Sequence, residues 1–179
     1  MLRTDGEKRT PSHTVWLLRV VMPSLHPTIR RSQGADHAAV LALLQGAGLP
    51  TDDLTSAPDP HLWVIEADES LFGVIGMERF GRHGLLRSLA IAPNYRQRRL
   101  GHQLVARLER DPEAIGVEQL VLVTETAETF FRAIGYEVID RRYVPEEIKQ
   151  SAEFQSLCPA SAVCMTKSLA SSRVGVPYG

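Results

Sequence analysis

The chain has 179 residues, of which 44% are apolar, 23% charged and 6% aromatic, and its formal net charge at pH 7 is −1. These values are typical of a soluble globular protein, and the length suffices for one domain with a sizeable core. The balanced charge argues against attraction to nucleic acid or to an anionic membrane surface, and no apolar run approaches the roughly 20 residues of a membrane span. We therefore expect a single cytoplasmic domain.

The first 26 residues show neither the period of a strand nor that of a helix, and prolines interrupt them. Their longest apolar run, residues 15–22, is broken by Arg19 and lacks a small-residue cleavage site, so no secretory signal is expected. The sequence predicts an N-terminal extension over residues 1–26, much of it mobile, a domain over 27–170 and a short tail over 171–179.

From Thr28 onward, apolar residues recur with the periods of strands and helices. The expected elements are strands at 28–31, 61–67, 71–80, 85–92, 119–124, 136–142 and 162–167, helices through 40–44, from near Gln97, and at 127–134, and a helical turn at 145–151. We expect the second helix to kink or restart at Asp111 and Pro112, because a residue before proline disfavours the α conformation. This order predicts a mixed sheet with helices on its faces, in which a parallel crossover leads to strand 119–124.

Three arginines, Arg96, Arg98 and Arg99, lie between strand 85–92 and the helix that follows it. Positive charge at a helix N-terminus opposes the helix dipole, at a cost of a few tenths to about 1 kcal/mol per charge. A bound polyanion would reverse this effect, since backbone N–H groups and guanidinium groups would then converge on it. The turn is therefore either an anion-binding site or a solvated basic turn.

The same segment resembles the first signature of the GNAT superfamily of acetyl-CoA-dependent N-acetyltransferases, V/I-x4-Q/R-x-x-G-x-G/A. Ile91, Arg96 and Gly101 match this signature, whereas Arg99 stands where the family has its middle glycine. In the family, the amides of this loop hold the pyrophosphate of coenzyme A, and the pantetheine arm pairs with the preceding strand like an added strand. The resemblance implies an α/β fold (an α+β mixed sheet), twisted and mostly antiparallel, with one parallel strand pair and helices on both faces. The coenzyme-binding residues that it implies are Leu89, Ala90, Ile91, Arg96, Gln97, Arg98, Arg99, Leu100, Gly101, His102 and Phe130.

Residues 127–136 are similar to the second signature of the family, a short helix that ends in glycine and an aromatic residue. The resemblance covers residues 28–169, with the elements in the same order. Residues 87–90, 124–127, 130–131 and 157–165 together also look like the GNAT proteins encoded in arsenic-resistance operons. The strand-end Thr-x-Thr-Ala with its aromatic pair is similar to the acetyltransferase domain of acetylglutamate synthases.

Both relationships imply acetyl transfer to the primary amine of a small amino-acid-like molecule, such as a toxic organoarsenical or phosphinic amino-acid analogue. The residues expected at the acceptor are Arg87, Thr124, Thr126 and Phe131. Arg87 either clamps an acceptor carboxylate or pairs with Glu78 or Glu66. The general-acid tyrosine of the family falls at Phe131, so the leaving thiolate takes its proton from solvent or from another residue.

Attack of the amine on the thioester requires a general base, because an amine with a pKa of about 9 to 10 is mostly protonated at pH 7. Many relatives carry a glutamate on the strand before the motif, but Arg87 and Ser88 stand there. Glu78 and Glu125 are alternative bases that act through water, and Ser88 is a residue that could hold this water. The other interpretation is that both carboxylates are solvated ends of strands.

The six histidines show no metal-ligand spacing, so no metal is expected. Cys158 and Cys164 are either small packing residues or a pair that binds arsenic(III). Three functions follow from these patterns. The first is an acetyltransferase that uses acetyl-CoA as cosubstrate and acts as a monomer or homodimer, the second is a catalytically weak acyl-CoA-binding module with a regulatory role, and the third is nucleic-acid binding through the basic turn, against which the net charge argues.

Overall fold

The structure is a computed structural model, and it describes residues 27–52, 54, 61–68, 70–111, 116–157, 159 and 161–169. All structural statements below refer to these residues. The expected N-terminal extension and C-terminal tail, the helix restart at Pro112, and Cys158 lie outside them.

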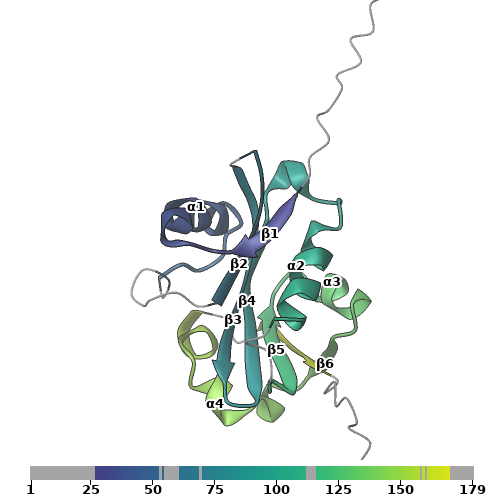
Figure 1. Ribbon diagram of the computed structural model, residues 1–179. Coiled ribbons are helices and arrows are strands. Elements are labelled where there is room, and N and C mark those ends of the chain that lie inside the picture. The colour runs from purple at the N-terminus through teal and green to yellow at the C-terminus, as the bar shows by residue number, and fades with distance from the viewer. Residues whose placement is uncertain are drawn as a thin grey trace, which may run out of the picture.

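Within the described residues, seven strands form one sheet in the order β1-β2-β3-β4-β5-β7-β6 (Figure 1). The strands are β1 (Thr28–Arg31), β2 (His61–Ala67), β3 (Ser70–Phe80), β4 (His83–Ile91), β5 (Gln119–Thr124), β6 (Glu137–Ile139) and β7 (Val163–Ser168). Neighbouring strands are antiparallel except β4 and β5, which are parallel. The mixed, mostly antiparallel sheet with one parallel pair is thereby confirmed.

Helices cover both faces of this sheet, as expected (Figure 1). They are α1 (His37–Gly46), α2 (Leu100–Glu109), α3 (Glu128–Ala133) and α4 (Glu146–Lys149), and a π-helical turn (Glu153–Leu157) follows α4. Successive residues of β3 point to opposite faces. Val74 belongs to a cluster with Val40 and Leu44 of α1, whereas Ile75 belongs to a cluster with Leu104 of α2. The alternation that defines a strand thus places one helix layer on each side.

The part of the sheet formed by β4 and β5 is covered by α4 and the π-helical turn. Ile148 of α4 and Phe154 of the turn pack with Leu85 of β4 and Val121 of β5. The flanking Leu120 and Leu122 of β5 pack in the α2 cluster on the opposite face. The continuous apolar run of β5 is therefore buried on both faces, as its sequence predicts.

Of the boundaries that differ from the sequence predictions, two have a clear physical cause. Helix α2 begins at Leu100 and not near Gln97, because Gln97 and Arg99 have φ values of +62° and +59°, which no α-helix accommodates. The strand expected at 136–142 ends at Ile139. There the Asp140 carboxylate accepts a hydrogen bond from the backbone N–H of Arg142 at 2.9 Å and begins a 3-10 turn in place of further strand.

A β-bulge in β4 controls the geometry of the centre of the sheet. Val74 pairs with Ala90 and Gly76 pairs with Arg87, so Ile75 alone faces two residues of β4. One of these two residues, Ser88, has a φ of +55°. A bulge bends the strand that carries it. The parallel pairing of β4 with β5 covers only residues 83–85 against 119–121, although both strands continue further. Beyond the paired segment the two strands separate.

One ion-pair cluster ties β1 to the start of α1 and makes the stability depend on pH. The Arg30 guanidinium donates to both carboxylate oxygens of Asp36 at 2.6 and 3.0 Å and to both of Glu66 at 2.7 and 2.9 Å. These hydrogen bonds lower the pKa of Asp36 and of Glu66 below their usual values. A lowered pKa in the folded state means that this stabilisation is present above the usual carboxyl pKa, about 4, and is lost as the pH falls through the lowered value.

We therefore expect the free energy of unfolding to fall on acidification below about pH 4, and to fall less steeply in Arg30→Gln, which starts from a lower value at neutral pH. Urea denaturation at several pH values measures both slopes. Arg132→Gln removes a single, more exposed pair with Glu128 on α3 and serves as the control. If the free energy of unfolding fell equally steeply with pH in the wild type and in Arg30→Gln, the pH dependence could not be assigned to this cluster.

Candidate active site

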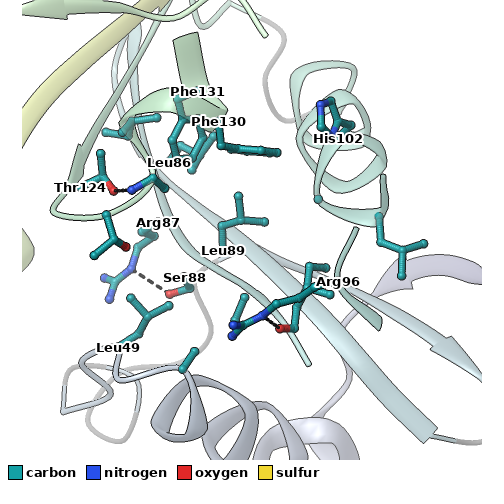
Figure 2. A pocket seen from close by; sticks show the side chains of 18 of the residues that line it. Leu49, Leu86, Arg87, Ser88, Leu89, Arg96, His102, Thr124, Phe130 and Phe131 are labelled. Atoms are coloured by element: carbon teal, nitrogen blue, oxygen red, sulfur yellow. Dashed lines mark hydrogen bonds between the residues drawn. The ribbon is translucent and has the colours of Figure 1, made fainter. Parts of the chain in front are cut away.

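A pocket of about 660 Å³ opens where β4 and β5 separate, between the end of α1, the start of α2 and α3 (Figure 2). This size is typical of a site for a small molecule. Of the residues that the sequence singles out for a site, those that line the pocket are Arg87, Ser88, Leu89, Ala90, Ile91, Arg96, Gln97, Arg99, Leu100, Gly101, His102, Thr124, Thr126, Phe130 and Phe131. Glu78, Arg98 and Glu125 are not among the lining residues.

One end of the pocket is formed by the basic turn and the first turn of α2. The Arg96 guanidinium donates from Nε to the carbonyl oxygen of Ile91 at 3.0 Å and so fastens the turn to the end of β4. Arg98 lies beside the pocket, with its guanidinium 5.5 Å from the ring centroid of Tyr95. The first N–H groups of a helix have no intrahelical partner, so this end of the pocket combines backbone donors with the positive charges of Arg96 and Arg99. It is suited to bind an anion.

The φ of Arg99 explains why the matching position of the family signature is a glycine. A non-glycine residue in the left-handed region costs about 1 kcal/mol or more. Replacing Arg99 by glycine should therefore raise the free energy of unfolding, by roughly 0.5 to 1 kcal/mol after the added flexibility of the unfolded chain is subtracted.

Arg98→Gly is the matched control for this prediction, since it removes the same charge at a neighbouring residue whose φ is not positive. It should lower the free energy of unfolding by about 0.5 to 1 kcal/mol or leave it unchanged. Urea denaturation of both variants tests the pair. Equal destabilisation of the two variants would show that Arg99 is not strained.

The middle of the pocket is apolar. Phe130 of α3 lies edge-on to His102 of α2 and to Phe131, with ring centroids 5.0 Å apart in both pairs. Leu89 on β4 faces this aromatic group across the pocket (Figure 2). Since β4 has left β5 at this point, its backbone borders the cavity. An extended apolar arm could lie along this strand.

The opposite end of the pocket is polar and carries a buried ion pair. Arg87 is only 6% exposed, and its Nε lies 3.1 Å from a carboxylate oxygen of Glu153 in the π-helical turn. The same Nε lies 3.5 Å from the Ser88 hydroxyl, and Nη1 lies 3.7 Å from a carboxylate oxygen of Glu78. Of the two sequence interpretations of Arg87, the pairing with Glu78 is present in the structure, whereas Glu66 pairs with Arg30.

The two carboxylates that the sequence proposes as bases lie apart from the cavity. The Glu78 side chain is 42% exposed, and Glu125 is also exposed. Thr124 lines the pocket, but its hydroxyl accepts a hydrogen bond from the N–H of Ala127 at 3.0 Å at the start of α3. The carboxylate that does line the pocket, Glu153, has no sequence signal because it follows a short helix with no repeating pattern.

No tyrosine occupies the position of the family's general acid. Phe131 is buried and packs edge-on against Tyr136. The Tyr136 hydroxyl donates to Glu109 at 3.2 Å, and burial, followed by the charge of Glu109, raises the pKa of Tyr136 above its usual value. Tyr136 is not among the residues that line the pocket, whereas Tyr95 is.

The described residues contain no helix long and apolar enough to cross a membrane. In the same part of the chain, no group of three or more His, Cys, Asp or Glu side chains could hold a metal ion. Cys164 is buried, and this burial raises the pKa of its thiol.

Residues 58–138 match the family model described as the acetyltransferase (GNAT) domain. This segment contains β2 to β5, the start of β6, the basic turn and most of the pocket. This part of the chain is therefore similar to acetyltransferase (GNAT) domains. The fold expected from the sequence is confirmed. A search of curated protein sequences gave no match.

Solved structures with the same fold agree with this match. One is the N-acetylglutamate synthase from Neisseria gonorrhoeae, complexed with coenzyme A and N-acetyl-glutamate (18% identity, TM-score 0.68, 80% of this chain and 35% of that chain). Another is a protein from Mycobacterium tuberculosis in complex with CoA (20% identity, TM-score 0.66, 79% of this chain and 99% of that chain). A third is the ribosomal-protein-S18-alanine N-acetyltransferase from Escherichia coli (17% identity, TM-score 0.62, 86% of this chain and 99% of that chain). The aligned region spans about a third of the length of the N-acetylglutamate synthase.

Proposed function

We propose that the protein transfers the acetyl group of acetyl-CoA directly to the primary amine of a small amino-acid-like molecule, with both substrates bound at once. The observation that carries this proposal is the two-ended pocket. Its basic end lies at the N-terminus of α2, its polar end holds Arg87 and Glu153, and the exposed edge of β4 connects the two. In solved structures of the same fold, coenzyme A is the bound ligand.

In this proposal each end of the pocket binds one substrate. The amides of the turn, with Arg96, Gln97 and Arg99, bind the pyrophosphate, because an anion there gains from both the helix dipole and the guanidinium charges. The pantetheine arm lies along β4, where a backbone N–H near Leu89 or Ala90 polarises the thioester carbonyl. The acceptor then occupies the end that holds Arg87.

The acceptor class follows from the same polar end and from the resemblance to the acetyltransferases of arsenic-resistance operons. We propose a cytoplasmic detoxification reaction on an amino acid or its phosphinic or arsenic-containing analogue. Arg87 is the candidate group for an acceptor carboxylate, since it lines the polar end of the pocket and a guanidinium matches the geometry of a carboxylate.

The alternative function is a binding module for acyl-CoA with little catalysis. Arg99 at the glycine position of the signature and Phe131 at the tyrosine position support it. The two functions differ in a simple measurement, since a module binds the thioester without releasing a thiol.

Thiol release from acetyl-CoA, measured over a panel of amines, tests the proposal, together with calorimetric titration of acetyl-CoA. The panel should contain amino acids, phosphinic and organoarsenical amino-acid analogues and a peptide with a free N-terminus. We expect binding, and thiol release that depends on an amino-acid-like acceptor. Binding without release supports the module, and the absence of both overturns the assignment.

A further inference from the structure

Glu153 lines the pocket, although no sequence motif singles it out. Among the described residues that line the pocket, the charged side chains besides His102 are Arg87, Arg96, Arg99 and Glu153. Glu153 is thus the one carboxylate in that set. Its side chain is 12% exposed, and that of its partner Arg87 is 5% exposed, so the pair lies in the wall of the cavity and not on the outer surface.

The position of Glu153 is fixed by the packing of the residue that follows it. Phe154 is buried against Val144 and Ile148, and its N–H donates to the Ser151 hydroxyl at 3.2 Å. Arg141 donates to the carbonyl oxygen of Phe154 at 3.0 Å, and its guanidinium lies 4.1 Å from the centroid of the Phe154 ring. The turn is anchored on both sides, and its carboxylate therefore has a defined place at the pocket wall.

The charges around Glu153 leave this end of the pocket able to bind a cation. Arg87 contacts two carboxylates, Glu153 at 3.1 Å and Glu78 at 3.7 Å, so the three groups together carry a formal charge of −1. Arg141, beside the turn, contacts Phe154. A carboxylate has about four lone-pair sites and can accept from Arg87 and from a second donor at once. An ammonium group supplies that donor.

We propose that Glu153 receives the ammonium group of the acceptor and takes its first proton, and that Arg87 is a positioning residue that orients the carboxylate. This inference rests on the proposed acetyl transfer. In the step, one N–H bond of the ammonium breaks and the proton passes to a carboxylate oxygen of Glu153, which later releases it to solvent. The freed nitrogen lone pair forms the C–N bond to the thioester carbon, and the carbonyl pair moves to its oxygen. When that pair returns, the C–S bond breaks, and the second amine proton ends on the thiolate through solvent.

Glu78 and Glu125 do not offer this arrangement. Glu78 reaches the pocket only through Arg87, and its side chain is 42% exposed. Glu125 is exposed and does not line the pocket. Glu153 combines burial, contact with Arg87 and a position in the wall of the cavity.

Glu153→Gln is the test, because it keeps the shape of the side chain and removes its charge and basicity. With the best acceptor of the panel, we expect kcat to fall by about 100-fold or more, which is the usual contribution of a general base. The dissociation constant of acetyl-CoA should not change, since the basic end is intact. In the wild type, kcat/KM for the acceptor should fall as the pH decreases, because protonation of the carboxylate removes the base, and the variant should lose this part of the pH dependence because it has no carboxylate at this position. Glu147→Gln is the matched control, because it removes the same charge from α4 at a side chain that is 61% exposed and outside the pocket.

Rescue separates a chemical role from a structural one. Glu153→Ala should recover part of its rate when formate is added, because formate supplies a carboxylate to the vacated volume, and Glu153→Asp should keep part of the activity. A wild-type kcat in Glu153→Gln overturns the role of Glu153 and leaves the proposed function intact. The role of Glu153 is also overturned if Glu78→Gln lowers kcat as much as Glu153→Gln does. The same holds if formate restores no activity to a Glu153→Ala variant that is folded. Absence of thiol release from the wild-type protein overturns the proposed function and the role of Glu153 together.

Discussion

Replacing Gly101 by glutamate should abolish coenzyme A binding while leaving the fold intact. Gly101 lies in the first turn of α2 and lines the basic end of the pocket. A Cβ at this position would meet the ring of Phe130 at 3.3 Å, a tight contact that still permits an alanine. A carboxylate placed here would face the proposed pyrophosphate site. Like charges brought together in a binding site cost several kcal/mol, so the dissociation constant should rise by about 100-fold or more.

Two variants separate the charge of this glutamate from its bulk. Gly101→Ala adds only the methyl group, and its dissociation constant should stay within about tenfold of the wild type, or 1.4 kcal/mol. Gly34→Glu introduces the same charge at a glycine whose surroundings are open, and it should bind coenzyme A normally. Calorimetric titration measures all three variants, and thermal melting checks that they fold. Tight binding by Gly101→Glu would place the coenzyme elsewhere.

The basic end of this site could be predicted from the sequence because its residues are neighbours in the chain. The motif from Ile91 to Gly101 follows a strand and begins a helix, and such a junction always brings backbone donors and side chains together. The strands could be predicted for a similar reason. The apolar residues of β5 are consecutive in the sequence, so the burial of this strand on both faces follows from its composition alone.

The polar end could not be predicted because its geometry depends on a register shift and on a distant turn. Side chains alternate along a strand, and one extra residue reverses the alternation beyond it. The bulge at Ser88 introduces this reversal in β4, and nothing in the sequence around Arg87 marks a positive φ. Glu153 lies 66 residues after Arg87, in a turn without periodicity, so only the folded chain brings the pair to 3.1 Å. Among the residues of the strand next to β4, the sequence offers Glu78 as a base. In the structure Glu78 contacts Nη1 of Arg87, whereas Glu153 contacts Nε.

Replacing Gly73 by valine should give the largest loss of stability, because at this position helix α2 packs directly against the sheet. Gly73 pairs with Ile91 of β4, and a Cβ there would collide with the Ile65 Cγ2 methyl group. It would also lie 2.7 Å from Ile91 Cδ1 and 3.2 Å from Leu104 Cδ1 on α2. Overpacking of a dense core costs about 1 to 3 kcal/mol, and a side chain with two methyl groups belongs at the upper limit, so we expect a loss of about 3 kcal/mol.

Urea denaturation of Gly73→Val measures this loss, and Gly34→Val is the control, since a side chain there meets nothing within 4 Å. Ile65→Ala removes the methyl group that causes the main collision, although alone it creates a cavity and is itself destabilising. Together the two substitutions should cost less than the sum of their separate costs, because the valine fills the space that the isoleucine leaves. The contact with Leu104 pushes α2 and its basic turn away from β4, so Gly73→Val should also weaken coenzyme A binding. The double variant, in which the valine can move into the space left by Ile65, should recover part of this binding. If the losses in free energy of unfolding are additive and coenzyme A binding is unchanged, the position of α2 does not depend on having a glycine at position 73.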